Sequence, residues 1–195
     1  MTKHSIKLLA RAVSFICSPP YFALLVLGGA LLAEPELWSN PHKIPFLIAV
    51  FLLGFLPALT AQDSIFLLRL SLGTRRKISF GSFLLSYTAF LLYAFSRGVH
   101  PLLKTISLSY FLTVVLLIIV NLFYKASGHG SAVAGPVLAL NLFFPRGWGL
   151  LFIPLLAIVT WARVATKEHS WQQVLVGMAL GLVATLNSFL IIRPF

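Results

Sequence analysis

Tyr124-Lys125-Ala126-Ser127-Gly128-His129-Gly130 stands between two apolar stretches and brings together a cation, a hydroxyl group, two glycines and a histidine. The stretch before it, residues 105–124, has about the 20 apolar residues that a helix needs to cross a hydrocarbon core of about 30 Å. Polar groups at membrane depth are costly, so residues of this kind are functional candidates. The segment therefore predicts the end of a membrane helix and a candidate site.

The composition is that of a membrane protein. Of the 195 residues, 59% are hydrophobic and 10% are charged, whereas soluble domains are about 45–50% apolar and about 25% charged. We therefore expect one all-α integral membrane domain over residues 1–195, a polytopic helix bundle. The net charge of +11 favours an anionic headgroup or substrate and no nucleic acid. With the lone Cys17, the chain has no disulfide framework and no cysteine metal site.

Apolar runs predict six or seven transmembrane helices. Turn residues at 145–149 divide the region from 131 to 163 into two short or tilted helices. The first run is too long for the core of a signal peptide, so we expect a retained helix that bends near Pro19 and Pro20. The predicted spans are residues 12–33, 44–62, 78–96, 105–124, 131–144, 149–163 and 171–192.

Strict alternation of seven spans predicts which loops share a side of the membrane. Ten of the 15 Lys and Arg residues then fall on the side of the N-terminus. Because cytoplasmic loops are enriched in Lys and Arg, we expect the N-terminus and the candidate site on the cytoplasmic side. That side holds the loops 63–77, 125–130 and 163–170, and the other side holds the loops 34–43, 97–104 and 145–148 with the C-terminus.

Three polar clusters on the predicted cytoplasmic side indicate a phosphate site. Arginine binds phosphate through two parallel hydrogen bonds, and a small-residue turn at a helix start offers backbone N–H groups. One histidine can attack phosphorus while a second protonates the leaving oxygen. The clusters are Arg69, Arg75, Arg76 and Lys77; Lys125, Ser127, Gly128 and His129; and Arg163, Lys167, His169 and Gln173.

Two of these clusters have a recognisable spacing. Ala126-Ser127-Gly128-His129 differs from Pro-Ser-Gly-His at its first residue only. Ala162-Arg163-x5-His169-x3-Gln173 follows Ser-Arg-x5-His-x3-Asp, with Ala for Ser and Gln for Asp. Arg69 and Arg76 have the separation of Lys-x6-Arg-Pro, with Arg for Lys and Lys77 for Pro. In these motifs, over a core of residues 63–195, the chain resembles the type 2 phosphatidic acid phosphatase superfamily, membrane phosphatases that act on lipid phosphates and diphosphates.

The resemblance implies a reaction through a phosphohistidine that needs neither metal nor cofactor. His169 would be the nucleophile and His129 the general acid for the leaving group. Lys125 has no counterpart in the motifs, and we add it on electrostatic grounds. The chain has four Asp and Glu residues, which we do not expect to cluster, so no metal site is predicted. The residues implied to hold the phosphoryl oxygens are Arg69, Arg76, Ser127, Gly128 and Arg163.

Gln173 is the most important departure from the motifs. Its side-chain oxygen can accept a hydrogen bond from His169, but it lacks the charge of an aspartate. The corresponding Asp-to-Asn change in a Ser-His-Asp triad lowers kcat by about 10⁴. Glu168 adjoins His169 in sequence, and on a helix it would point elsewhere.

The sequence leaves two functions open. The first is a metal-independent phosphatase for a lipid phosphate or isoprenoid diphosphate whose apolar tail enters from the bilayer; Arg163, His129 and His169 favour it. The second is a catalytically impaired relative that acts as a lipid-binding or structural subunit of a larger membrane complex; Gln173 and Ala162 favour it. A transporter is disfavoured because the two halves of the chain show no inverted repeat.

Overall fold

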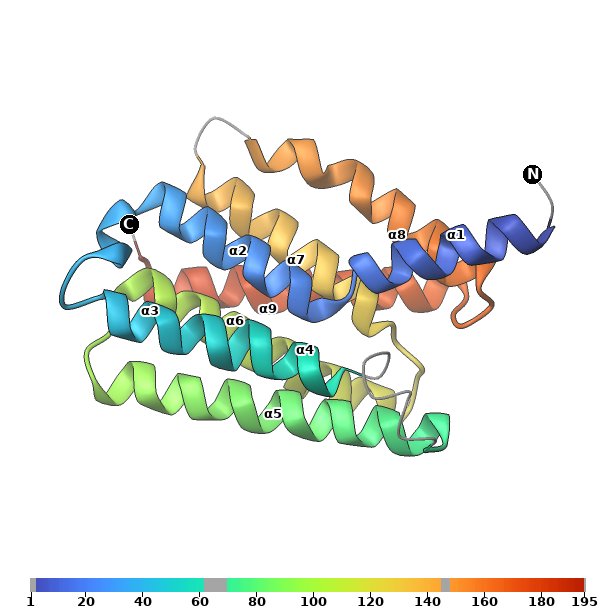
Figure 1. Ribbon diagram of the computed structural model, residues 1–195, viewed down its shortest axis with the longest axis horizontal. Helices are drawn as coiled ribbons and strands as arrows, with labels where there is room; N and C mark the ends of the chain where they lie inside the picture. Colours follow the sequence, from blue (N-terminus) through green and yellow to red (C-terminus); the bar gives the residue numbers. More distant parts are fainter. Residues whose placement is uncertain (1–2, 62–69, 145–147, 195) are drawn as a thin grey trace.

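The computed structural model describes residues 3–61, 70–144 and 148–194, which form helices and connections without a β-strand (Figure 1). The prediction of an all-α fold is confirmed. In chain order the elements are α1 (Lys3–Ile16), α2 (Pro19–Ala33), the 3₁₀ turn η1 (Pro35–Trp38), α3 (Lys43–Ala49), the π-helical segment η2 (Val50–Phe55), α4 (Leu56–Thr60), α5 (Leu72–Ser96), α6 (Pro101–Asn121), α7 (Gly128–Phe143), the 3₁₀ turn η4 (Trp148–Phe152), α8 (Ile153–Ala165) and α9 (Trp171–Ile192).

Several helices have the length and apolar character of membrane spans. Within the described ranges there are four such stretches, and α1 with α2 would add a fifth as one bent span. The bend of 47° falls next to Pro19 and Pro20, as predicted. Leu85 and Leu92 are exposed on α5, as lipid-facing side chains would be. The structure therefore supports a multi-pass membrane protein, while the count of six or seven spans stays a prediction. The four stretches are Lys43–Thr60, Gly73–Ser96, Pro101–Asn121 and Trp171–Ile192.

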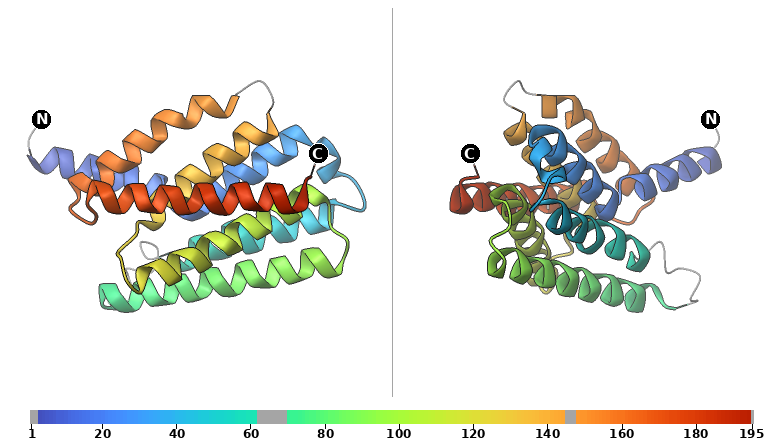
Figure 2. Two further views of the ribbon diagram at one scale, coloured as in Figure 1. Left: turned by 180° about the vertical axis from the view of Figure 1, so that it is seen from behind. Right: turned by 60° about the vertical axis from the view of Figure 1, so that its left-hand side comes forward.

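The region from 131 to 163 forms two short helices, as predicted. These are α7, with 16 residues, and α8, with 13 residues. Most residues of α7 are buried, because this helix packs against α2, α8 and α9 (Figure 2). The first turn of α7, which carries the Ser-Gly-His motif, is therefore held inside the bundle.

Glycines bring α7 and α9 into backbone contact. A Cβ atom added at Gly181 would lie 2.5 Å from the carbonyl oxygen of Ser131, and one added at Gly177 would collide with the carbonyl oxygen of Ser127. The spacing Gly177-x-x-x-Gly181 thus serves packing within one chain. This contact fixes the start of α9 against the start of α7.

The bundle has two polar ends. The N-terminus lies toward the end where α9 starts, and the C-terminus lies at the other end, near the connection from α2 to α3 (Figure 1). The main apolar core includes Leu37, Phe90 and Leu102, which are fully buried and join η1, α5 and α6. The described loops thus lie at these two ends, while the alternation of seven spans across a membrane stays a prediction.

Candidate active site

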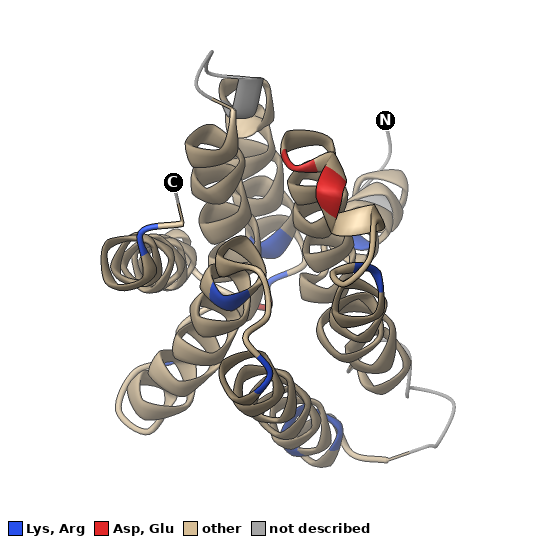
Figure 3. Cartoon of the chain, turned by 90° about the vertical axis from the view of Figure 1, so that its left-hand side faces the viewer, with Lys and Arg blue, Asp and Glu red and all other residues tan. Residues whose placement is uncertain are grey.

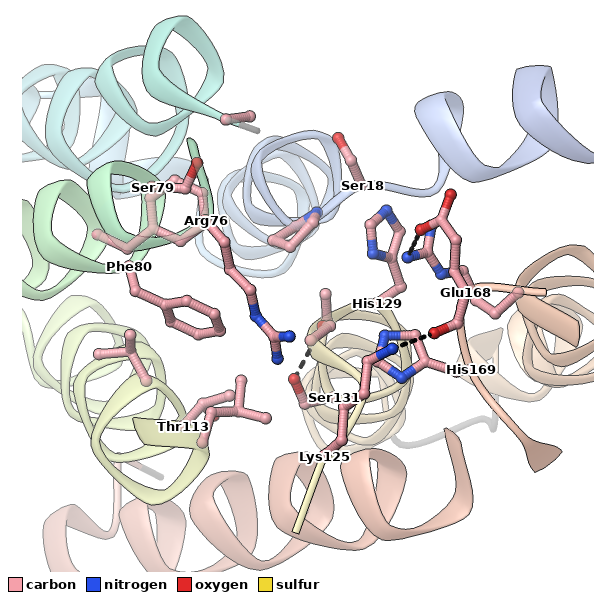
Figure 4. Close-up of a pocket in the computed structure, with 18 of the residues that line it drawn as sticks. Ser18, Arg76, Ser79, Phe80, Thr113, Lys125, His129, Ser131, Glu168 and His169 are labelled. Carbon is pink, nitrogen blue, oxygen red and sulfur yellow. Dashed lines mark hydrogen bonds and ion pairs between the residues drawn. The ribbon is translucent and has the colours of Figure 1, made fainter. Parts of the chain in front are cut away.

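A cavity of about 420 Å³ lies at the end of the bundle where α7 and α9 start (Figure 4). The α1–α2 junction, α5, α6, the first turn of α7 and the loop between α8 and α9 form its wall. Its polar lining includes Ser18, Arg76, Lys125, His129, Arg163, Lys167, Glu168 and His169. Its apolar lining includes Phe80, Phe83, Val114 and Leu117.

All three predicted clusters contribute to this cavity. Arg76 comes from α5, Lys125 precedes α7, and Arg163 lies in the last turn of α8. Ser127 and Gln173 lie behind the lining, and Arg69 falls outside the described residues. The predicted site residues that line the cavity are Arg76, Lys125, Gly128, His129, Arg163 and His169.

Ser127 shapes the start of α7 from behind. It is fully buried, and its Oγ atom accepts a hydrogen bond from the N–H of Gly130 at 3.3 Å. Its own N–H donates to the backbone carbonyl of Gln173 at 3.0 Å, which ties α7 to α9. The first N–H groups of a helix lack intrahelical partners and attract anions. Gly128 and His129 therefore place the positive end of α7 at the cavity.

Gln173 holds His169 in one orientation and one tautomer. Nδ1 of His169 lies 3.2 Å from Oε1 of Gln173, and the same oxygen accepts the N–H of Ser170 at 3.1 Å. Because an amide oxygen only accepts, Nδ1 carries the proton and Nε2 keeps its lone pair. Ser170 accepts the N–H of Gln173 in return, which completes a capping box at the start of α9. The helix start thus fixes the ring of His169 and leaves the lone pair of Nε2 unprotonated.

The surroundings of His169 keep its imidazole neutral. Burial lowers the pKa of His169, and the charges of Arg163, Lys125 and Arg76 lower it further, to about 4. The hydrogen bond to Gln173 acts in the opposite direction. Since an unperturbed histidine titrates near about 6.5, the lone pair of His169 is available across the neutral range.

His129 is the second histidine of the cavity. It is the second residue of α7, and Figure 4 shows its ring between Ser18 and the loop that carries Glu168. Its Nε2 atom is buried and has no hydrogen-bond partner among the described residues. A buried polar atom without a partner carries a desolvation cost. A ligand in the cavity that exchanges a hydrogen bond with Nε2 would remove this cost.

Arg163 and Glu168 form an ion pair in the cavity wall. The Arg163 guanidinium group is 5% exposed, and it donates to Oγ of Ser14 on α1 and to the Glu168 carboxylate. The backbone carbonyl of Glu168 accepts from Nζ of Lys125 at 2.7 Å. The carboxylate of Glu168 thus points to Arg163 and not to His169, but Glu168 does not lie on a helix, because α8 ends at Ala165 and Glu168 lies in the turn before α9.

Arg76 reaches the cavity from the opposite wall. Its NH2 group donates to Oδ1 of Asn121 at 2.6 Å, and Asn121 donates in turn to the carbonyl of Leu117 at 2.7 Å. The guanidinium group also lies 5.7 Å from the ring centre of Phe80. Figure 4 shows its free end directed toward the middle of the cavity. Asn121 therefore positions Arg76 between the charged and the apolar parts of the lining.

The apolar part of the cavity contains two tyrosines. The rings of Tyr87 and Tyr110 lie 5.4 Å apart and nearly perpendicular. The Tyr110 hydroxyl is buried without a hydrogen-bond partner among the described residues. The cavity therefore combines cations at one part with aromatic and aliphatic side chains at another, which suits an amphiphilic anion.

Sequence reasoning missed Glu168 as a cavity residue and Ser14 as a hydrogen-bond partner of Arg163. Glu168 had a usable signal, since it is one of four acids in the chain and directly precedes the motif histidine. Lys167, which belongs to the third predicted cluster, lines the cavity and adopts a left-handed φ of 58° in the tight turn after α8. Ser14 gave no signal, because its approach to Arg163 depends on the bend between α1 and α2.

The expectation that the acids do not cluster is wrong. Glu34 and Glu36 come together with His100 at the other end of the bundle, away from the cavity. Within the described residues, the cavity itself has Glu168 as its carboxylate, and that group is paired with Arg163.

Comparison of the chain with protein-family models, with curated proteins and with solved structures finds no match to any of them. The function is therefore inferred from the site itself.

Proposed function

We propose that this chain is a metal-independent membrane phosphatase that hydrolyses a lipid phosphate or an isoprenoid diphosphate through a phosphohistidine. The observation that carries the proposal is the state of His169. Its Nδ1 proton is held by Gln173, its pKa is about 4, and Arg163 is among the cations that lower that pKa. A neutral nucleophile among fixed cations is what attack on a phosphate dianion requires.

The proposed reaction has two steps. In the first, the Nε2 lone pair of His169 forms a bond to phosphorus while the bond from phosphorus to the leaving oxygen breaks. His129 gives its proton to that oxygen; the charge of the bound phosphate favours a proton on His129 beforehand. In the second step, water attacks the phosphohistidine, His129 takes the water proton, and the N–P bond breaks to release inorganic phosphate.

The cations have separate roles in this proposal. Arg76 and Lys125 approach from opposite walls and bind the phosphoryl oxygens, together with the first N–H groups of α7. Arg163 is held by Ser14 and Glu168, so an incoming phosphate replaces the Glu168 carboxylate as its anionic partner. The apolar lining takes the first part of the lipid tail.

A second candidate function is favoured by the Arg163–Glu168 ion pair and by the neutral side chain of Gln173. The carboxylate already neutralises the guanidinium group, and Gln173 gives no charge to stabilise a phosphorylated imidazole. These features favour a non-catalytic relative that binds a lipid or serves as a structural subunit of a membrane complex.

Phosphate release by the purified full chain distinguishes the two. The substrates are a phosphatidic acid and a polyprenyl diphosphate, assayed with EDTA, and the His169→Ala variant is the control. The proposal expects release that EDTA leaves intact and the substitution abolishes, with a labelled phosphohistidine trapped by acid-free quenching. Release no greater than that of the variant, from protein with an unchanged thermal unfolding transition, would establish the binding or structural function instead.

We further propose seven spans, with the N-terminus and the cavity on the cytoplasmic side. The test places single cysteines at Ser5 and at Ser39 in a Cys17→Ser background and applies a membrane-impermeant maleimide to intact cells. Labelling of Ser39→Cys but not of Ser5→Cys supports this orientation, and the reverse pattern contradicts it. Labelling of both positions would contradict the seven-span topology.

A further inference from the structure

Two carboxylates and an imidazole meet at the end of the bundle opposite the cavity. The ligand atoms of Glu34, Glu36 and His100 all lie within 4.8 Å of one another. Oε1 of Glu36 is 3.0 Å from Nε2 of His100. Figure 3 looks onto this end of the bundle and shows acidic residues gathered there. Two of the four acids in a chain of net charge +11 thus lie beside one histidine.

The backbone at each of these residues is fixed by a helix end. Glu34 is the C-cap of α2, and its N–H donates to the carbonyl of Ala30 at 2.8 Å. Glu36 belongs to η1, which is anchored by the fully buried Leu37. His100 is the N-cap of α6, and its Nδ1 accepts the N–H of Leu102 at 3.3 Å. The three donors are therefore presented by ordered backbone.

A second imidazole adjoins the first. The ring of His42, which directly precedes α3, lies 5.3 Å from the ring of His100 and nearly perpendicular to it. His42 is not one of the three residues whose ligand atoms lie within 4.8 Å of one another, so its ring would have to turn toward them to become a fourth ligand. With it, the donors come from the ends of α2, α3 and α6 and from η1.

We propose that Glu34, Glu36, His100 and His42 form a structural site for a divalent transition-metal ion of the zinc class. Carboxylate oxygen and imidazole nitrogen at about 2.0–2.2 Å in a four-coordinate arrangement are the ligands zinc takes. Imidazole ligands distinguish such an ion from Mg²⁺ and Ca²⁺, which prefer oxygen. The ion would join four chain segments at the end of the bundle that lacks the phosphate site.

Ion binding at His100 requires a proton to move from one ring nitrogen to the other. Nδ1 now accepts from Leu102, so the neutral ring carries its proton on Nε2, facing Glu36. An ion on Nε2 displaces that proton to Nδ1, and the hydrogen bond from Leu102 is given up. The ion thus replaces the proton between Glu36 and His100.

Metal titration of the untagged, metal-free full chain in detergent tests this site. Zn²⁺ affinity is measured by calorimetry, Co²⁺ absorption reports four-coordinate geometry, and Mg²⁺ is the comparison ion. The variants are Glu36→Gln and His100→Asn, since asparagine preserves the helix cap of α6. Glu168→Gln, at the other end of the bundle, is the matched control. The proposal expects one equivalent of Zn²⁺, a higher unfolding temperature with the ion, and binding weakened roughly 100-fold by either variant but not by the control.

Zn²⁺ binding that is unsaturable, or that is equally tight in Glu36→Gln, His100→Asn and the control, overturns the metal site. This test is independent of the proposed phosphatase. EDTA would remove the structural ion as well, so phosphate release is also measured with Glu36→Gln protein, which should keep EDTA-resistant activity. If Glu36→Gln protein loses Zn²⁺ binding but still releases phosphate, the metal site and the phosphatase site are separate. If the unsubstituted chain binds Zn²⁺ but releases no phosphate, the metal site stands and the proposed phosphatase does not.

Discussion

Histidines lie at both ends of the bundle, but their neighbours give them different chemistry. At the cavity end, His169 is held by the neutral amide of Gln173 among Arg163 and Lys125, and its pKa falls to about 4. At the other end, His100 faces the carboxylate of Glu36, with Glu34 close by. Cations around a histidine favour its neutral form, whereas carboxylates beside a histidine favour a bound cation. The residues around each histidine, more than the histidine itself, are therefore the basis of the different roles that we propose for the two ends.

The largest expected difference between the ends is in catalysis. His169→Ala should lower phosphate release by about 10⁴-fold or more, because the nucleophile is lost. His100→Asn, at the opposite end, should leave release within about threefold, since it removes no group of the cavity. Initial rates on a polyprenyl diphosphate measure both. If both variants fold and lose phosphate release to the same extent, catalysis does not belong to the cavity end alone.

Gln173→Leu tests the hydrogen bond that orients His169 at the cavity end. Without the acceptor, Nδ1 loses its fixed proton and the ring can rotate, so kcat should fall about 100-fold while KM changes little. The isosteric Gln173→Glu keeps the acceptor and adds charge, and should preserve or raise kcat. A kcat for Gln173→Leu that equals the unmodified protein would mean that this amide does not position His169.

The next largest expected effect comes from disturbing the glycine contact between α7 and α9. In Gly177→Ala the added methyl group meets the Ser127 backbone, which should cost about 1–3 kcal/mol of unfolding free energy and displace the motif turn. Gly81→Ala is the control, because a Cβ atom there has open space. Thermal unfolding in detergent measures both. Similar unfolding temperatures for Gly177→Ala and Gly81→Ala would show that α7 and α9 can move apart without a loss of unfolding free energy.

Glu168→Gln tests the ion pair that distinguishes Arg163 from the other cations. Without the carboxylate, phosphate no longer competes for the guanidinium group, so KM should fall about three- to tenfold. Glu36→Gln, a carboxylate of the other end, should leave KM unchanged. A rise in KM for Glu168→Gln would instead indicate that Glu168 is needed to hold Arg163 in place.

The smallest expected effect is on the pH profile. The proposed reaction uses the neutral form of His169, so the acid limb of kcat/KM should appear as pH drops through about 4. Lys125 lowers the pKa of His169, so Lys125→Gln should raise that pKa and move the acid limb to higher pH. Lys104→Gln, on α6, removes the same charge away from the cavity and should not move it. An acid limb at the unperturbed value of about 6.5 would mean that the cations do not act on His169.

Sequence patterns predicted much of the cavity because its residues lie in local motifs. The Ser-Gly-His segment caps α7, and the interval from His169 to Gln173 spans one helical turn, so both arrangements depend on short-range geometry. The ion pair of Glu168 with Arg163 was missed because a helix was assumed where α8 had already ended. The cluster of Glu34, Glu36 and His100 was also missed, since His100 is more than sixty residues from the carboxylates.

Hydropathy, charge and motif spacing by themselves determined that this is an all-helical membrane protein with a basic, histidine-containing site, since apolar length and local capping depend only on neighbouring residues. The tertiary structure decided which distant groups meet: Ser14 with Arg163, Arg76 with Asn121, and Glu36 with His100. These contacts depend on the bend between α1 and α2 and on the close packing of the helices. Such long-range contacts leave no periodic signal in the sequence.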